Sequence, residues 1–286
     1  MTSATQNTLQ PSQPDQLPQG EHFYLNTPFG QLFAKRWTPA GSQQPPAMSP
    51  PRATPFLLLH DSLGSVELWR DFPQRLAEVS GRDVIAYDRL GFGLSDPVTE
   101  PIDINFIALE AERFIPLICD YFQLERFIAF GHSVGGCMAV YTAAQHPQRC
   151  EALITESTQA YVEELTRDGI RDAEELFREQ KQLDRLARYH GERTRWVLDS
   201  WINSWLSPTF DHWTLDSALA NVTCPTLVLH GELDEYGSVA QPEHIATGIQ
   251  AEVQLELLPG IRHFPHRESP DLILDKVTSF LKQSLN

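Results

Sequence analysis

Short runs of consecutive apolar residues alternate with stretches of helical periodicity along most of the chain. Apolar runs of this length, bounded by turn residues, are typical of strands buried on both faces of a sheet. The runs lie at residues 56–59, 84–87, 127–130, 152–154, 226–229 and 253–258. The amphipathic stretches between them lie at residues 69–79, 106–122 and 137–145. This alternation predicts an α/β class: a mostly parallel central sheet with helices on both faces and ligand sites at the carboxyl ends of the strands.

The N-terminal part of the chain departs from this alternation. Residues 1–20 are rich in Gln, Ser, Thr and Pro, and we expect a disordered tail because so few apolar side chains cannot offset the entropy of ordering. Residues 23–37 alternate moderately around Pro28-Phe29-Gly30, which predicts a β-hairpin. Residues 40–55 include two Pro-Pro pairs, and we expect an exposed, extended loop there.

A third kind of pattern covers residues 159–221. This region has no convincing strand but several helical stretches, among them residues 172–189 and 193–206. An all-helical segment between two strands of a parallel sheet is expected to lie as a cap over the strand ends. The pattern therefore predicts a core of residues 21–158 and 222–286, with a helical cap inserted after the sixth strand.

Composition narrows the choice of partners. An apolar fraction of 41% is enough for a sizeable core, and a formal charge of −16 repels nucleic acids and anionic lipid surfaces. No run approaches the ~18 apolar residues of a membrane span, and the first residues lack the pattern of a signal peptide. We therefore expect a cytoplasmic protein with no membrane partner. The four cysteines lie far apart with no CxxC pair, which is typical of reduced thiols.

The strongest chemical signal is the run Gly131-His132-Ser133-Val134-Gly135-Gly136. It follows a predicted buried strand and precedes a predicted helix, which is the context of the G-x-S-x-G nucleophile elbow. In that elbow the serine occupies a strained turn, and small flanking residues relieve the crowding of the backbone. Ser133 is the candidate nucleophile.

A serine hydroxyl needs a base to remove its proton and a carboxylate to orient that base. After an elbow of this kind the chain order is acid, then histidine. Asp234 follows a predicted strand and is the preferred acid, with Glu232 and Glu235 as competitors. His263 follows the next strand and is the preferred base, with His266 as the competitor.

The oxyanion of acyl transfer requires backbone N–H donors, normally one after the nucleophile and one from the loop after an earlier strand. Val134 is the expected first donor, and Ser62, in the run His60-Asp61-Ser62-Leu63-Gly64-Ser65, is the expected second. The alternative for this run is a tight connection without a catalytic role. No HExxH or comparable pair of ligands is present, so we expect neither a catalytic metal nor another cofactor.

With these pieces assembled, the sequence resembles the α/β-hydrolase family, in its cap-bearing branch of esterases, lactonases and meta-cleavage-product hydrolases. The resemblance covers nearly everything from Phe23 to Leu281. It includes the run Asp88-Arg89-Leu90-Gly91-Phe92-Gly93-Leu94-Ser95, which looks like the D-x-x-G-x-G-x-S turn of that family and is expected to be structural. The chain departs from the family's usual His-Gly by placing Asp61 after His60, so a carboxylate or an altered turn is expected beside the oxyanion hole.

Candidate substrate contacts come from the cap and from the two loops at the site. Trp201 and Trp205 are spaced i to i+4, which places both on one helix face, and Trp196 lies on the same helical stretch. These tryptophans could line a pocket or pack the cap onto the core. His132 and Asp61 are further candidates because they adjoin the nucleophile and the oxyanion loop.

The residues predict a serine hydrolase that cleaves a small, fairly apolar carboxylic ester or lactone through an acyl-enzyme. The first alternative is hydrolysis of a carbon–carbon bond in a meta-cleavage-type diketone, because the same triad serves that reaction. The alternative of another class is a protein that binds a small molecule on the same scaffold.

Overall fold

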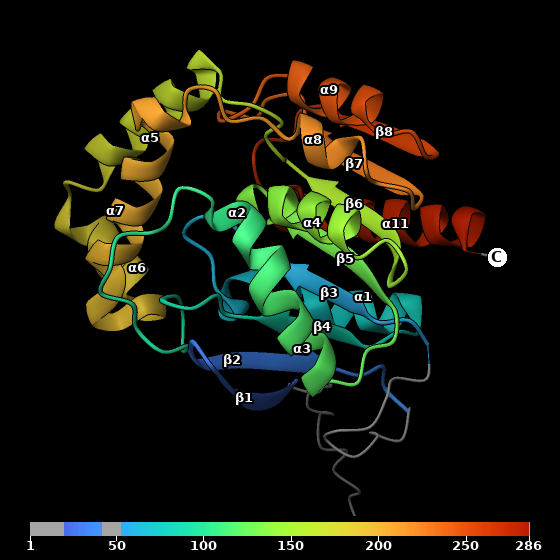
Figure 1. The fold of residues 1–286 in the computed structure, drawn as a ribbon. Coiled ribbons are helices and arrows are strands. Elements are labelled where there is room, and N and C mark those ends of the chain that lie inside the picture. The colour runs from blue at the N-terminus through green and yellow to red at the C-terminus, as the bar shows by residue number, and fades with distance from the viewer. Residues whose placement is uncertain (1–19, 42–52, 286) are drawn as a thin grey trace, which may run out of the picture.

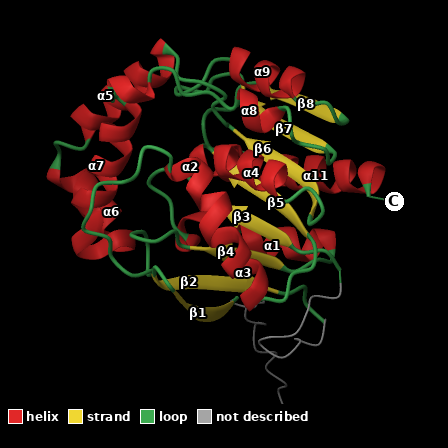
Figure 2. Ribbon diagram, in the orientation of Figure 1, coloured by secondary structure: helices red, strands yellow, loops and turns green. Residues whose placement is uncertain are grey.

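The computed structural model describes residues 20–41 and 53–285. The predicted disordered tail, except for its last residue, and most of the predicted extended loop lie outside these ranges. The described chain forms one eight-stranded sheet flanked by helices (Figures 1 and 2). The strands are β1 (Glu21–Thr27), β2 (Gly30–Trp37), β3 (Phe56–Leu59), β4 (Val84–Tyr87), β5 (Phe127–His132), β6 (Cys150–Glu156), β7 (Thr226–Gly231) and β8 (Val253–Leu258).

The order of the strands in the sheet is β1-β2-β4-β3-β5-β6-β7-β8. β1 and β2 pair antiparallel, β2 pairs antiparallel with β4, and every later pair is parallel. The predicted mostly parallel sheet is therefore confirmed. The predicted hairpin is also present, because Thr27 pairs with Gly30 across a turn at Pro28 and Phe29.

Helices cover both faces of the sheet, and the strand residues explain why. Successive residues of β3 belong to different cores: Leu57 and Leu59 pack on the side of α4 (Val134–Gln145), whereas Phe56 and Leu58 pack on the side of α1 (Phe72–Ser80) and α11 (Pro270–Ser284). Side chains alternate across a strand, so a run that is apolar at every position is buried on both faces. Ile245, from α9 (Ala240–Gly248), joins the core on the α4 side.

Two predicted helices have different bounds in the structure. The stretch 69–79 is divided, because a short helical turn ends at Trp69, Arg70 has a φ of 56°, and α1 then begins at Phe72. The stretch 106–122 contains α2 (Phe106–Leu109), a π-helical turn and α3 (Ile115–Tyr121). Pro116 stands in the first turn of α3 and has no N–H for the regular ladder, which accounts for the wider turn before it.

An all-helical insertion lies between β6 and β7; its first three helices stand beyond one end of the sheet in Figure 1, whereas its last and shortest helix lies beside α9 and β7. Its helices are α5 (Glu164–Leu176), α6 (Gln180–His190), α7 (Thr194–Trp205) and the short α8 (Asp216–Leu219). The predicted stretch 172–189 is thus two helices, separated by a turn, whereas 193–206 corresponds closely to α7. None of the described helices is both long and apolar enough to cross a membrane.

Candidate active site

Ser133 stands between β5 and α4 with φ 56° and ψ −126°, a conformation that is strained for any residue with a side chain. The glycines around it are required by close approach of the backbone. A Cβ added at Gly131 would overlap the carbonyl oxygen of Gly135, and one added at Gly135 would overlap the carbonyl oxygen of Leu59. The third glycine, Gly136, faces the Thr158 hydroxyl in the same way. The sequence Gly-x-Ser-x-Gly-Gly therefore folds into a sharp elbow.

The histidine expected to act as base is held by the preferred acid. Asp234 lies in the loop after β7, and His263 Nδ1 is 2.8 Å from its Oδ1 and 2.9 Å from its Oδ2. The carboxylate also accepts a 2.8 Å hydrogen bond from Tyr236 N. Of the two competitors, Glu232 is exposed and Glu235 pairs with Arg262 at 3.4 Å, so Asp234 alone of the three contacts His263.

Burial and charge set the protonation of this pair. Burial lowers the pKa of His263, but the negative charge of Asp234 and its hydrogen bond outweigh burial, so the pKa lies above the ordinary histidine value. Burial also raises the pKa of Asp234, but the charge of His263 outweighs this effect and holds the pKa below its ordinary value. Neutral His263 therefore donates from Nδ1 to an ionised carboxylate and keeps Nε2 as an acceptor.

Ser133 and His263 line one pocket, at the carboxyl end of β5. No hydrogen bond joins Ser133 Oγ to His263 in the described chain, and such bonds are often long in unliganded enzymes. The cavity has a volume of about 80 Å³, and α7 contributes Trp201 and Trp205 to its wall, as their spacing predicted. The remaining lining is mixed, with apolar or aromatic side chains and polar ones in equal number: Leu63, Ile170, Tyr236, Phe264, Asp61, Ser62, Gln159 and Thr166.

The two backbone N–H groups expected to bind the oxyanion belong to Ser62 and Val134. Ser62 lines the pocket, and Val134 is the first residue of α4. Neither backbone N–H donates a hydrogen bond to another described residue. The loop that carries Ser62 is fixed by His60, which contacts Asp61 O through Nδ1 at 2.8 Å and accepts from Arg89 N through Nε2 at 3.1 Å. This arrangement requires a neutral ring, and burial indeed holds the pKa of His60 well below the ordinary value.

The run that begins at Asp88 supports the same loop, as expected for a structural turn. Asp88 accepts hydrogen bonds from Val66 N at 2.6 Å and Leu94 N at 2.7 Å, so it joins the segment after the oxyanion loop to its own turn. Ser95 Oγ closes the turn by donating to Asp88 O at 2.6 Å.

Asp61 lines the pocket and shapes the oxyanion loop. Its Oδ1 accepts a 2.9 Å hydrogen bond from Leu63 N, a local side-chain turn that a glycine in its place could not form. Its Oδ2 lies 3.6 Å from His132 Nδ1 and 3.8 Å from a guanidinium nitrogen of Arg267. Burial raises the pKa of Asp61, but His132 and Arg267 outweigh it and hold the pKa well below the ordinary value.

Two expected substrate contacts are elsewhere. Trp196 packs edge-on against Phe92 and donates from Nε1 to Glu100 O at 3.0 Å, and it is absent from the wall of the Ser133 pocket. The face of α7 that carries Trp196 points toward Gly91, in the turn that begins at Asp88. Helical spacing alone therefore did not distinguish Trp196 from Trp201. His132 is buried behind the elbow, where its Nε2 lies 2.8 Å from His263 O.

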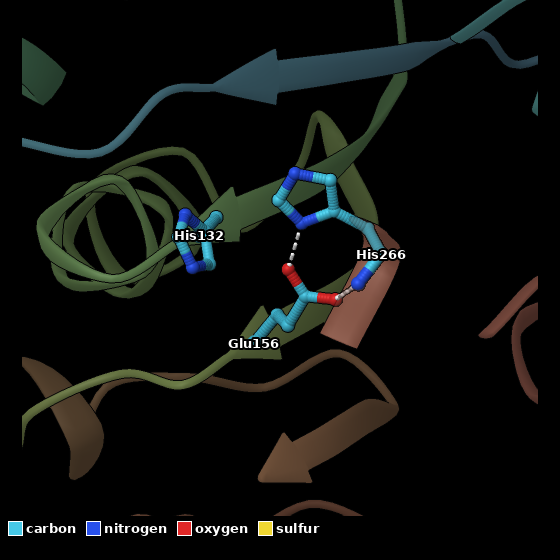
Figure 3. Close-up of side chains that lie close together, drawn as sticks. All are labelled: His132, Glu156 and His266. Carbon is cyan, nitrogen blue, oxygen red and sulfur yellow. Dashed lines mark hydrogen bonds and ion pairs between the residues drawn. The ribbon is translucent and has the colours of Figure 1, made fainter. Parts of the chain in front are cut away.

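Sequence reasoning missed a buried cluster beneath the site, formed by His132, Glu156 and His266 (Figure 3). Glu156 ends β6 and is fully buried. Its Oε1 accepts from His266 N at 2.8 Å, and its Oε2 is 2.5 Å from His266 Nδ1. The cluster touches the site through the backbone, because Ser133 N donates to Glu156 O at 2.8 Å. Glu156 and His266 are 110 positions apart, so no local pattern could have joined them.

These three side chains are of types that bind transition metals, and their ligand atoms lie within 4.8 Å of one another. The closest two atoms, at 2.5 Å, are a nitrogen and an oxygen at the distance of a short hydrogen bond. A shared proton therefore accounts for the contact between Glu156 and His266. His132 Nδ1 and His266 Nε2 have no hydrogen-bond partner in the described chain.

Comparison with known proteins identifies the class that this fold and site define. The family described as alpha/beta hydrolase fold matches residues 54–200, just over half of the chain. The chain therefore belongs to the α/β-hydrolase fold family, as the resemblance predicted, and is a hydrolase of that fold.

Individual relatives are distant. The human protein Serine hydrolase BPHL is 27% identical over 237 residues, covering 79% of this chain and 78% of the relative. An abhydrolase domain-containing protein of Schizosaccharomyces pombe is 31% identical over 114 residues, and the match spans only 40% of each protein. The crystal structure of a proline iminopeptidase from Mycobacterium smegmatis shares the fold, with a TM-score of 0.69, 20% identity, and coverage of 92% of this chain and 98% of that one.

Proposed function

We propose that this protein is a carboxylic-ester hydrolase that acts on a small, fairly apolar ester or lactone through an acyl-enzyme. The observation that carries the proposal is the shared pocket of Ser133, on its strained elbow, and His263, held by Asp234. A nucleophile, an oriented base and two free N–H donors are the parts that acyl transfer requires.

In the first half of the reaction, His263 Nε2 accepts the proton of Ser133 Oγ as the oxygen attacks the ester carbonyl. The oxyanion that forms is stabilised by the N–H groups of Ser62 and Val134. The imidazolium is stabilised by Asp234 and then gives its proton to the leaving alcohol. Water attacks the acyl-serine with the same base, and the acid product and free Ser133 result.

The wall of the pocket supports the substrate class. A cavity of about 80 Å³ lined by Trp201, Trp205 and Ile170 favours a small apolar acyl group. In this proposal the helical insertion acts as the cap, because its helices α5 and α7 supply these three side chains. Asp61 and Tyr236 provide polar atoms on the same wall.

The proposal is tested first by labelling. A fluorophosphonate is expected to modify the folded protein at Ser133 and to leave a Ser133→Ala variant unmodified. Absence of labelling in the folded wild type would contradict any serine-hydrolase function and would favour the small-molecule-binding alternative.

Substrate assays then separate the chemistries. We expect turnover of p-nitrophenyl acetate and butyrate that Ser133→Ala abolishes. Turnover of a meta-cleavage-type diketone without turnover of either ester would replace the proposal by carbon–carbon hydrolysis. Turnover of proline p-nitroanilide alone would replace it by peptidase activity, which the similarity to proline iminopeptidases makes worth measuring.

A further inference from the structure

Two of the four cysteines meet at the edge of the sheet opposite the candidate active site. Cys150 begins β6, Cys224 precedes β7 by two residues, and their sulfur atoms are 3.9 Å apart. They are 74 positions apart in the sequence, and for that reason no sequence pattern indicated that the two thiols lie close together. The other two differ: Cys137 donates to the carbonyl of Gln159 at 3.2 Å inside the core, and Cys119 is buried in α3.

We propose that Cys150 and Cys224 form a reversible disulfide, so that this edge of the sheet is an oxidation site independent of the candidate active site. A disulfide requires the sulfurs to approach to about 2.05 Å from 3.9 Å, and in this proposal a movement of the Cys224 side chain and backbone supplies that approach. Cys224 is the residue free to make that shift, because it lies in the connection before β7 and not in the strand ladder.

Both cysteines are buried, but they lie just below the protein surface, in the wall of a pocket. Both cysteines line a surface pocket formed where the strands begin, together with Arg82 and Arg126. Cys224 is the more exposed of the two, at 7% against 3% for Cys150. The hydrogen bond between the two sulfurs lowers the pKa of the Cys224 thiol and raises the pKa of the Cys150 thiol, whereas burial raises the pKa of Cys119 to about 12. Cys224 is therefore the thiol that ionises and attacks first.

The oxidant in the proposed step is a low-molecular-weight disulfide, for which glutathione disulfide is the probe. The Cys224 thiolate attacks one sulfur of the probe, forms a mixed disulfide and releases one glutathione thiolate. Cys150 loses its proton to solvent and attacks the Cys224 sulfur, which closes the protein disulfide and releases the second glutathione thiolate. The two cysteines are oxidised, and the probe is reduced to two thiols.

The disulfide would join the start of β6 to the segment just before β7. The helical insertion lies between these two strands in the sequence. The loop that it closes contains all of α5, α6, α7 and α8. Closing a loop of this length restricts the unfolded chain strongly, so the oxidised protein should melt roughly 5–15 °C higher than the reduced protein.

The experiment uses the full chain, reduced and then equilibrated with glutathione disulfide under native conditions. Thiols are counted after denaturation without reductant, and the protein is digested for mass spectrometry. We expect the count to fall from four free cysteines to two, with loss of two hydrogens from the intact mass and one crosslinked peptide that joins Cys150 to Cys224. A Cys119→Ser variant is the matched control and should behave as the wild type.

The variants Cys150→Ser and Cys224→Ser should show no crosslink and no rise in melting temperature on oxidation. A count that stays at four in the wild type, or one bound glutathione without a crosslink, would overturn the proposal. So would an equal amount of disulfide in Cys224→Ala. The wild-type measurement does not depend on the folding of any variant, and none of these readouts uses esterase activity.

Discussion

The structure has two buried histidine–carboxylate pairs whose histidines, His263 and His266, lie three residues apart, and the two pairs have opposite electrostatics. In the first pair, His263 has a raised pKa and Asp234 a lowered one. In the second pair, burial holds the pKa of His266 well below its ordinary value and raises the pKa of Glu156 to about 7. The first pair is therefore poised to carry separated charges, whereas the second shares one proton with little charge.

The difference teaches that contact between histidine and carboxylate does not by itself define a base. His263 lines a pocket with Ser133, but His266 packs against the rings of Trp69 and Phe72 in the core. Access to the nucleophile, and not the hydrogen bond, distinguishes the two histidines. The second pair instead links β6 to the short helix α10 (Pro265–Glu268), which directly follows His263.

The largest expected effect separates the two histidines by activity. His263→Ala removes the base and should lower kcat/KM for p-nitrophenyl butyrate by about 10⁴-fold or more. His266→Asn keeps a polar group that can accept or donate near the position of Nδ1 and should lower kcat/KM by less than about tenfold. The measurement is steady-state kinetics on both variants after circular dichroism has shown that they fold. Equal losses in the two variants would remove the functional distinction between the pairs.

Substitutions of the two carboxylates should differ in the same way as those of the two histidines, with a smaller loss of activity. Asp234→Asn removes the charge that stabilises the imidazolium and favours the correct tautomer, so kcat should fall by roughly 10³- to 10⁴-fold. Glu156→Gln retains an acceptor for His266 N and should leave kcat within about tenfold. The kinetics should be measured from pH 6 to 9. Because the pKa of His263 is raised, kcat/KM of the wild type should decrease on the acid side of that pKa, where the base is protonated.

In the free energy of unfolding, we expect the two histidines to rank in the opposite order, with the larger loss at His266. His266→Leu removes the ring that contacts Glu156 Oε2 and leaves the buried carboxyl with only the backbone N–H of residue 266, which should lower the free energy of unfolding by about 3 kcal/mol. In His263→Leu the Asp234 carboxylate keeps the 2.8 Å hydrogen bond from Tyr236 N and has His230 Nε2 at 3.7 Å, so the loss should be smaller, about 1 kcal/mol. Urea denaturation of both variants at pH 7 gives the comparison. A greater loss for His263→Leu would show that the first pair, and not the second, holds this loop in place.

Much of the first pair's setting could be predicted from the sequence. Unbroken apolar runs marked the strands of the sheet, and the glycines around Ser133 marked the elbow, because these constraints act over a few neighbouring residues. The order of strand ends placed Asp234 and His263 in successive loops on one edge of a parallel sheet. Whether they carry out catalysis is still a prediction.

The second pair and the cysteine pair could not be predicted, since each depends on contacts between distant strands and loops. Glu156 lies two residues beyond the apolar run 152–154, and His266 reads as a residue at the start of a helix. Trp196 shows the converse limit: helical spacing places it on α7, but only the packing against Phe92 decides which way that face points. The divided helix at residues 177–179 was missed because no proline or glycine marks the break.

The smallest expected effect concerns protons in the second pair. Between pH 4.5 and 6.5 the unfolded chain carries one proton on the pair, on His266, and the folded protein also carries one, on Glu156. Folding then changes no proton number, so this pair gives the wild type no pH dependence of stability in that window. In Glu156→Gln the folded protein has a neutral His266, whereas the unfolded chain still protonates it below pH 6.5.

The unfolded state of Glu156→Gln therefore binds one more proton than the folded state. The free energy of unfolding of this variant should fall as the pH falls through 6.5. The expected loss is about 1.4 kcal/mol per pH unit, or about 2 kcal/mol between pH 6.5 and 5, relative to the wild type. Urea denaturation at several pH values measures it, and Glu232→Gln, a change at an exposed carboxylate, is the matched control. Parallel curves for the wild type and Glu156→Gln would mean that His266 is protonated in the folded variant. The contrast between the two pairs would then lie in their access to the pocket alone and not in their charge.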